Sequence, residues 1–221
     1  MLTIVLAVWL WKAEPRRWVR ALGYSALSAV IAQALLGGLT VLLLLPPALS
    51  VAHACLGQAV FSLLVCLATA TSRSWLHQPV GVGDGRTAGL RRLAVAVAIL
   101  AALQLFLGAV IRHTGHAVHL HMGGAFVLLV SVGWLMARLA RLGRGVPVMR
   151  RSAWRLCVLI GMQIVLGLLV YTHRGSVALR TTHVALGALL LAQAIVLAWE
   201  MVRRASGVQA YLATGAVPLE M

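Results

Sequence analysis

The chain has 221 residues, of which 62% are hydrophobic and 10% are charged, and its mean hydropathy is +0.96. A soluble domain of this length needs far more charged surface to stay dispersed, so the composition excludes that class and predicts a membrane protein. The net charge of +15 does not indicate nucleic-acid binding, because the charges lie in loops between apolar stretches.

Six charge-free stretches reach about 20 residues, the length with which a helix crosses a bilayer. They are residues 21–45, 48–72, 93–111, 113–137, 156–172 and 181–199. A further apolar stretch, residues 1–11, covers about half a crossing. Basic residues follow this stretch, whereas in a signal peptide they precede the apolar core. We interpret it as the second half of a helix whose first half is absent from the sequence, in preference to a short interfacial helix.

The basic residues divide unevenly between the two sets of loops. Sixteen of the nineteen lie in residues 12–20, 73–92 and 138–155 and at Arg203 and Arg204, whereas the alternate loops hold only Arg112, Arg174 and Arg180. The positive-inside rule places the basic loops in the cytoplasm, where they contact anionic lipid. The sequence therefore predicts a multi-pass protein of the cell inner (plasma) membrane.

A short pattern repeats along the chain. A Gln-x-x-x-Gly motif is followed by a histidine, first at Gln33, Gly37 and His53 and again, with identical spacing, at Gln163, Gly167 and His183. A third Gln-x-x-x-Gly, at Gln104 and Gly108, precedes a span that starts at His121. The pattern predicts two parallel four-helix halves. The Gln163 motif follows the Gln33 motif at a fixed distance in sequence, and subtracting that distance from His121 gives a position before Met1. We therefore expect that one helix and the start of the next are absent.

Histidines gather at the predicted outer ends of the spans. Seven of the eight map there: His53, His113, His116, His119, His121, His173 and His183; His77 alone is predicted to be cytoplasmic. Histidine within a membrane span is costly and usually functional, and heme iron in helix bundles is held by imidazoles from facing helices. The equivalent positions of His53, His121 and His183 favour heme ligation near the outer face over hydrogen bonding between helices.

The neighbouring residues suggest supporting roles. Gln33, Gln104 and Gln163 are interpreted as hydrogen-bond partners between helices, and Gly37, Gly108 and Gly167 as close-packing positions. A glycine at the fourth position after the histidine, as at Gly57 and Gly187, would leave a flat groove for a porphyrin. Arg112, beside His113, can pair with a heme propionate, and its alternative role is an interfacial anchor. A second metal site at His116, His119 and His173 is less favoured, because no carboxylate or thiolate accompanies them.

Several of these motifs together resemble heme A synthase. They are Gln33-Ala-Leu-Leu-Gly-Gly-Leu-Thr40, the helix of His53, Gly108-Ala-Val-Ile-Arg112-His113-Thr114-Gly115 and His183-Val-Ala-Leu-Gly-Ala188. The resemblance implies eight transmembrane helices in two similar halves. It also implies a heme b cofactor between His121 and His183, with Arg112 and His113 beside it, and the heme O substrate near His53. The implied reaction oxidises a methyl group of heme O to the formyl group of heme A for terminal oxidase assembly, with heme O synthase or oxidase assembly factors as partners.

The chain departs from the family in its N-terminal half. The family's first helix, a glutamate of an outer loop and the first histidine of the substrate site all precede what is present here. Met122 follows His121 where the family generally has arginine. The ligands of the cofactor half are therefore expected to be complete and those of the substrate half incomplete.

The predicted organisation is an incomplete N-terminal half (residues 1–73), a cytoplasmic linker (74–92), a C-terminal four-helix half (93–204) and a cytoplasmic tail (205–221). Two other functions stay open beside the enzyme. One is a membrane electron carrier of the cytochrome b type, and the other is a non-catalytic relative that binds heme or stabilises an oxidase assembly complex. A homo-oligomer is compatible with each of them.

Overall fold

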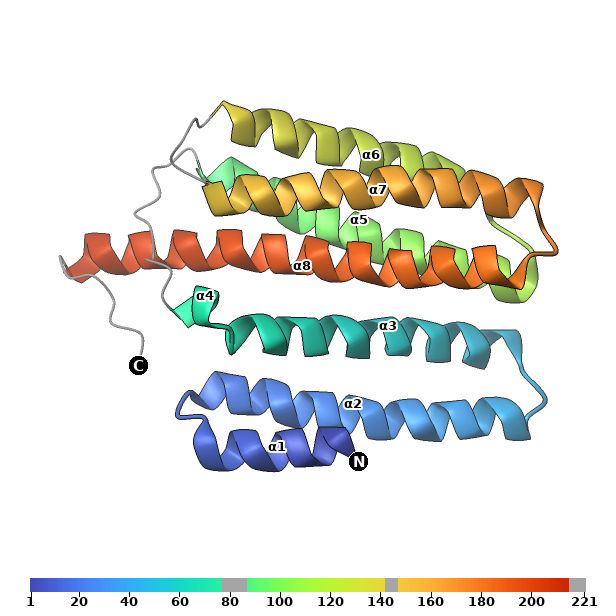
Figure 1. Ribbon diagram of the computed structural model, residues 1–221, viewed down its shortest axis with the longest axis horizontal. Coiled ribbons are helices and arrows are strands. Elements are labelled where there is room, and N and C mark those ends of the chain that lie inside the picture. The colour runs from blue at the N-terminus through green and yellow to red at the C-terminus, as the bar shows by residue number, and fades with distance from the viewer. Residues whose placement is uncertain (77–86, 142–146, 215–221) are drawn as a thin grey trace. The chain divides into compact units, whose positions relative to one another are not determined.

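The protein is all-α in a computed structural model, and the described residues form eight helices and no strand (Figure 1). The structure describes the backbone of residues 1–76, 87–141 and 147–214 and the side chains of residues 1–76, 88–141 and 148–203. The helices are α1 (Leu2–Ala13), α2 (Arg17–Leu42), α3 (Pro47–Ala70), α4 (Arg73–Leu76), α5 (Thr87–Thr114), α6 (Val118–Ala140), α7 (Pro147–Thr172) and α8 (Val177–Thr214). His77 and much of the predicted linker lie outside the described residues.

Six helices are long and apolar enough to cross a membrane, which confirms the predicted multi-pass class. The spans within them are Arg17–Leu42, Pro47–Ala70, Ala88–Thr114, Val118–Ala140, Val148–Thr172 and Val177–Arg203. The shorter apolar helix α1 has 12 residues, in agreement with the half-length stretch expected at residues 1–11. Most of the helices extend further into the basic segments than the charge-free stretches do, because arginine is a good helix former.

One predicted boundary is wrong. The span expected at 113–137 begins too early, because α5 continues through Arg112 and His113 to Thr114. The chain then turns through Gly115 and Ala117, whose φ angles of 75° and 72° are left-handed and end the helix. Helix α6 therefore begins at Val118, and its first turns carry His119 and His121.

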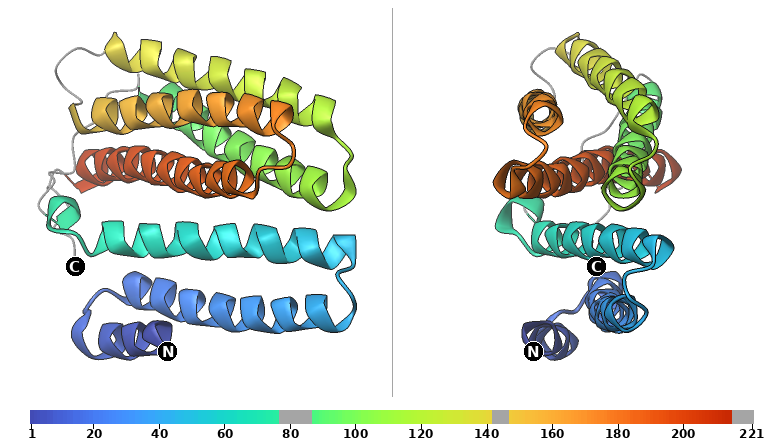
Figure 2. Two further views of the ribbon diagram at one scale, coloured as in Figure 1. Left: turned by 45° about the vertical axis from the view of Figure 1, so that its right-hand side comes forward. Right: turned by 90° about the vertical axis from the view of Figure 1, so that its right-hand side faces the viewer.

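The described helices fall into two compact units. The first contains α1–α4 and the end of α5 from Gly108, and the second contains the rest of α5 and α6–α8. In the first unit α2 and α3 lie side by side, as Figures 1 and 2 show, and α1 packs on α2. The turn between α2 and α3 contains the prolines, with Pro46 capping α3 and Pro47 in its first turn. Leu44 and Leu45 precede them with left-handed φ angles of 59° and 61°.

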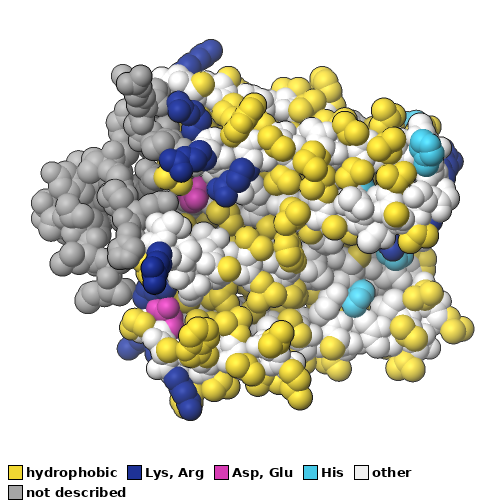
Figure 3. Space-filling model, in the orientation of Figure 1, with side chains coloured by type: hydrophobic (Ala, Val, Ile, Leu, Met, Phe, Trp, Pro, Cys, Tyr) yellow, Lys and Arg dark blue, Asp and Glu magenta, His cyan; other side chains and the backbone are white. Residues whose placement is uncertain are grey.

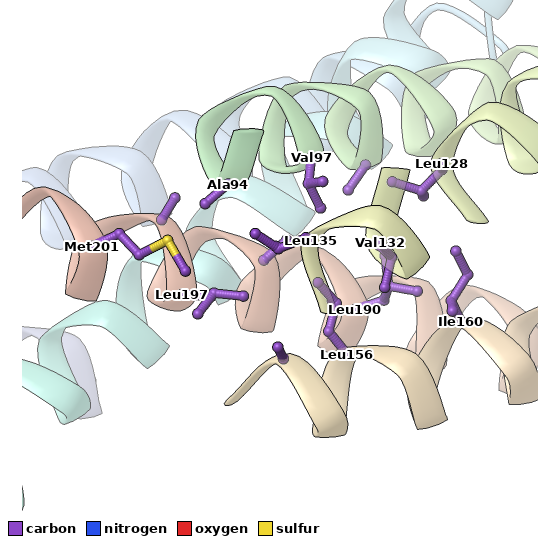
Figure 4. Packing of buried hydrophobic residues seen from close by; sticks show 14 of the residues in the cluster. Ala94, Val97, Leu128, Val132, Leu135, Leu156, Ile160, Leu190, Leu197 and Met201 are labelled. Atoms are coloured by element: carbon purple, nitrogen blue, oxygen red, sulfur yellow. The ribbon is translucent and has the colours of Figure 1, made fainter. Parts of the chain in front are cut away.

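In the second unit, apolar side chains from four helices form one core (Figure 4). Its labelled members are Ala94 and Val97 of α5, Leu128, Val132 and Leu135 of α6, Leu156 and Ile160 of α7, and Leu190, Leu197 and Met201 of α8. Leu135, Leu156 and Leu197 are fully buried. In a bilayer, close packing of such side chains stabilises helix association, since lipid is as apolar as leucine. Both α6 and α8, the helices on which His121 and His183 lie, contribute side chains to this core.

The outer surfaces of the helices are apolar, as lipid-facing surfaces must be (Figure 3). Leu35, Phe126 and Leu168 are each exposed by 65% or more. On the face drawn in Figure 3, lysine and arginine side chains gather towards one end of each unit, and histidines lie towards the other end. The basic end is the one that the loop charges predict to be cytoplasmic.

Candidate functional site: three glutamine–histidine helix pairs

Helices α7 and α8 meet at a polar contact between Gln163 and His183. The side-chain amide nitrogen of Gln163 donates a hydrogen bond to the backbone carbonyl oxygen of His183, at 3.1 Å. The same nitrogen lies 3.2 Å from Nε2 of the His183 ring. One amide group therefore contacts both the backbone and the imidazole of the histidine at the start of the next helix.

The first unit repeats this arrangement between α2 and α3. The amide nitrogen of Gln33 donates to the carbonyl oxygen of His53 at 3.0 Å and lies 3.5 Å from Nε2 of its ring. A third pair joins α5 to α6, where Gln104 donates to the carbonyl oxygen of His121 at 2.7 Å. These bonds confirm the prediction that the three glutamines connect neighbouring helices, and they give the sequence repeat a structural basis.

Glycines allow the close approach at these contacts. A Cβ atom built on Gly37 would lie 2.7 Å from Cε1 of His53, and one on Gly167 would lie 3.2 Å from Cε1 of His183. The histidine rings thus pack directly on the backbone of the preceding helix, and the prediction that Gly37 and Gly167 are close-packing positions is confirmed.

The glycines after the histidines face the glutamines. A Cβ atom on Gly57 would lie 2.9 Å from the amide nitrogen of Gln33, and one on Gly187 would lie 3.2 Å from that of Gln163. The prediction that these two glycines leave an open groove for a porphyrin is therefore wrong, because a glutamine side chain covers each of them. In each of these helix pairs, the histidine packs on the glycine of the Gln-x-x-x-Gly motif. The glutamine in turn packs on the glycine of the His-x-x-x-Gly motif.

Only in the second unit do two of the three histidines meet, among the described residues. The ring centroids of His121 and His183 are 6.5 Å apart, and the ring planes make an angle of 67°. Two imidazoles that bind one metal ion from opposite sides, at metal–nitrogen distances of about 2 Å, have centroids roughly 6–6.5 Å apart. The separation of His121 and His183 therefore fits a bis-histidine iron site.

Several buried polar atoms of these helix pairs have no hydrogen-bond partner among the described residues. Nδ1 of His53, His121 and His183 is buried and has no hydrogen-bond partner among the described residues, and the same holds for Oε1 of Gln33, Gln104 and Gln163. Buried polar atoms in native proteins are nearly always paired, so an unpaired set at three equivalent positions needs an explanation. A ligand or an ordered water beside each ring would supply the missing partner of Nδ1.

The remaining predicted residues lie at helix ends. Arg112 is exposed and His113 half-buried in the last turn of α5, in the segment that belongs to the first unit, with His53. His116, His119 and His173 are exposed. Among the described residues no three histidine, cysteine, aspartate or glutamate side chains converge on a possible metal position.

Sequence reasoning missed a buried polar contact in the second unit. The amide nitrogen of Gln193 in α8 donates to the hydroxyl of Ser152 in α7 at 2.7 Å, and Ser152 is fully buried. Both residues stand outside the repeat, but a glutamine within an apolar span is itself a signal, since such amides usually bond to a neighbouring helix. The contact joins α7 and α8 a second time, far along both helices from Gln163 and His183.

The described residues of the first unit include an ion pair at the predicted cytoplasmic end. Nε of Arg16 lies 2.7 Å from Oε1 of Glu14, and the guanidinium also donates to the backbone carbonyl oxygen of Ala70 at the end of α3. The hydrogen bond from the Arg16 side chain holds the pKa of Glu14 below its usual value. This pair ties the turn between α1 and α2 to α3.

Comparison of the chain with family models, with curated proteins and with solved structures finds no match.

Proposed function

We propose that this chain is a heme-binding membrane protein in which His121 and His183 would be the protein ligands of one heme b. The observation that carries the proposal is the 6.5 Å separation of the two rings, on helices that contribute to a common core.

The residues present fit a low-spin heme. Two neutral imidazoles per iron are typical of hemes that carry electrons in helix bundles. A heme b held in this way supplies a one-electron carrier within the membrane. His121 and His183 would then provide the two nitrogens that hold the heme.

We further propose the reaction of heme A synthase, the oxidation of a methyl group of heme O to a formyl group. The motifs Gln33 to Thr40, Gly108 to Gly115 and His183 to Ala188 support this assignment. In this proposal the first unit takes the heme O substrate at His53, whose environment repeats that of His183. Conversion of the methyl group to the formyl group consumes one water and releases four electrons and four protons, so a membrane electron acceptor completes the reaction.

The pair of histidines in the second unit equally suits a cytochrome b-type electron carrier, which needs two ligands for its iron and no substrate site. The two candidates differ in the first unit. An enzyme binds heme O near His53 and forms heme A, whereas a carrier contains heme b alone.

The experiment that separates them is extraction of the hemes from the purified chain, followed by mass analysis. The enzyme is expected to contain heme b and, when it is expressed together with heme O synthase, to accumulate heme A. Heme b without heme A under those conditions supports the carrier. A chain purified from heme-replete cells without any heme would contradict both.

The proposed orientation places the histidine ends of the helices at the outer face of the plasma membrane. The sixteen-to-three division of the basic residues supports it. Single cysteines at Ala48 and Gly175 are expected to react with an impermeant thiol reagent added outside, and a cysteine at Ser74 only after the membrane is opened. Labelling of Ala48 or Gly175 only from the cytoplasmic side would contradict this topology.

A further inference from the structure

The orientation of the Gln163 amide is fixed by its backbone partner. The carbonyl oxygen of His183 can only accept a hydrogen bond, so the amide group must turn its nitrogen, and not its oxygen, towards that atom. The amide nitrogen carries two hydrogens, and one of them serves the carbonyl. The other is available for the ring of His183.

This second hydrogen determines which ring nitrogen carries the proton. The amide nitrogen lies 3.2 Å from Nε2 of His183, and two donors at that distance would repel each other. Nε2 must therefore be the acceptor, and the proton of the neutral imidazole must be on Nδ1. Gln33 imposes the same choice on His53, less strongly, since the corresponding distance is 3.5 Å.

We propose that Gln163 and Gln33 are positioning residues that hold His183 and His53 as Nδ1–H tautomers, with the lone pair on Nε2. A metal binds an imidazole through an unprotonated nitrogen, so in this tautomer Nε2 can become a ligand once the hydrogen bond from the amide to Nε2 is released. The tautomer follows from the hydrogen bonds alone, and its use in heme ligation rests on the proposed function. Each glutamine then keeps its bond to the backbone carbonyl when Nε2 is given to iron.

The third pair offers a control within the same molecule. Gln104 donates to the carbonyl oxygen of His121, but its amide oxygen, not its nitrogen, faces the next helix at Gly124. Among the described residues the side chain of Gln104 makes no hydrogen bond to the ring of His121, and that ring bonds to the backbone of Gln104 instead. The side chain of Gln104 therefore shares the backbone bond of Gln163 without the ring contact, and we expect it to leave the tautomer of its histidine unchanged.

The test is ¹⁵N NMR of the full chain in nanodiscs, prepared without heme and labelled at the histidine rings. A pH of about 9 keeps the imidazoles neutral, since their usual pKa is about 6.5. The signals of His183 and His53 are identified by their loss in His183→Asn and His53→Asn. We expect both residues to be mainly Nδ1–H in the unsubstituted chain.

Gln163→Met removes the donor at nearly constant length. The loss of one hydrogen bond should shift the tautomer ratio of His183 towards Nε2–H by roughly two- to tenfold and leave His53 unchanged. Gln163→Glu should shift the ratio further, because a carboxylate accepts a hydrogen bond from Nε2–H. Gln104→Met, the matched control, should leave both His121 and His183 as they are. If the Gln163 variants do not fold, Gln33→Met tests the inference in the first unit, where the tautomer ratio of His53 is measured.

The inference is overturned if His183 is mainly Nε2–H in the unsubstituted chain, or if Gln163→Met folds and leaves its tautomer ratio unchanged. These outcomes are independent of heme binding. A chain that never binds heme but has His183 as Nδ1–H would contradict the proposed function alone. A chain that binds heme but has His183 as Nε2–H when heme-free would contradict the inference alone.

Discussion

The helix pair α2–α3 of the first unit and the pair α7–α8 of the second place a glutamine, a histidine and two glycines in the same contact. The hydrogen bonds from glutamine to the histidine carbonyl are nearly equal in length, at 3.0 Å and 3.1 Å. The pairs differ in what lies beside them, because His183 has the ring of His121 at 6.5 Å and His53 belongs to a unit without a second histidine of the repeat.

This difference separates the structural role of the motif from its chemical role. The glutamine bond and the glycine contacts are present in both units, so they serve helix packing whether or not a second ligand is available. The chemistry depends on the neighbouring helix that adds a second imidazole. The repeated motif therefore predicts how each helix pair packs. Whether the pair can bind one iron through two imidazoles depends on the helix beside it.

The largest expected effect is the loss of heme from the second unit. His121→Ala or His183→Ala should abolish the low-spin signal, because a single imidazole leaves one axial position of the iron open. His53→Ala should leave that signal largely intact, and the unsubstituted chain should retain at most one low-spin heme. The measurement is the reduced-minus-oxidised absorption spectrum, normalised to protein.

His119→Ala is the matched control for this experiment, since His119 lies in the same helix as His121 but is exposed. It should behave like the unsubstituted chain. If His53→Ala removes the low-spin band while His121→Ala preserves it, the iron is in the first unit and the comparison between the units is reversed.

The sequence predicted the helix pairs well because the signals were local. Apolar length gave the six spans, and the spacing of Gln33 to His53 and of Gln163 to His183 gave two equivalent contacts. The end of α5 was placed too early, since His113 was taken for the start of a span and the turn depends on the left-handed backbone of Gly115 and Ala117. The cover that Gln33 and Gln163 provide over Gly57 and Gly187 was missed, because side-chain direction across two helices cannot be read from composition.

A second prediction asks which unit Arg112 serves. Sequence reasoning assigned Arg112 to the heme b held by His121 and His183, yet the end of α5 belongs with the first unit. If Arg112 pairs with a propionate of that heme, Arg112→Ala should weaken heme retention by about 1–3 kcal/mol, and Arg112→Lys should restore only part of it. Heme loss to apomyoglobin measures the effect.

Arg112→Ala combined with His53→Ala tests which heme Arg112 contacts. An unchanged effect there shows that Arg112 acts on the heme of the second unit. Wild-type heme retention in Arg112→Ala would instead support the role of an interfacial anchor.

A third prediction uses the difference in tightness between the two glycine contacts. Gly37→Ala should destabilise the first unit by about 1–2 kcal/mol, because its Cβ atom would be 2.7 Å from the His53 ring, which must move. Gly167→Ala should cost less in the second unit, where the distance is 3.2 Å. Thermal unfolding in detergent measures both effects.

Gly38→Ala is the control next in sequence, because a Cβ atom there meets nothing within 4 Å. Alanine at this helical position should stabilise the chain by about 0.5–1 kcal/mol. Equal destabilisation by Gly37→Ala and Gly38→Ala would show that the ring contact is not the cause.

The smallest effect concerns the ion pair between Glu14 and Arg16 of the first unit. The hydrogen bond from Arg16 lowers the pKa of Glu14 from its ordinary value of 4.5. A carboxyl group whose pKa is lowered by folding stabilises the folded state above the unfolded pKa, and this stabilisation is lost as the pH falls through the folded pKa. Acid below pH 4.5 should therefore loosen the turn between α1 and α2 and its tie to Ala70.

Glu14→Gln should remove this pH dependence and cost about 1 kcal/mol at neutral pH, since it replaces a charged acceptor by a neutral one. Hydrogen–deuterium exchange of α1 and the start of α2, compared between pH 3.5 and pH 7, measures the effect. Arg17→Gln, at an exposed neighbouring position, should keep the pH dependence of the unsubstituted chain. If Glu14→Gln retained the same acid-induced exchange in α1, the ion pair would not be its source, and another acid-sensitive contact would have to distinguish the first unit from the second.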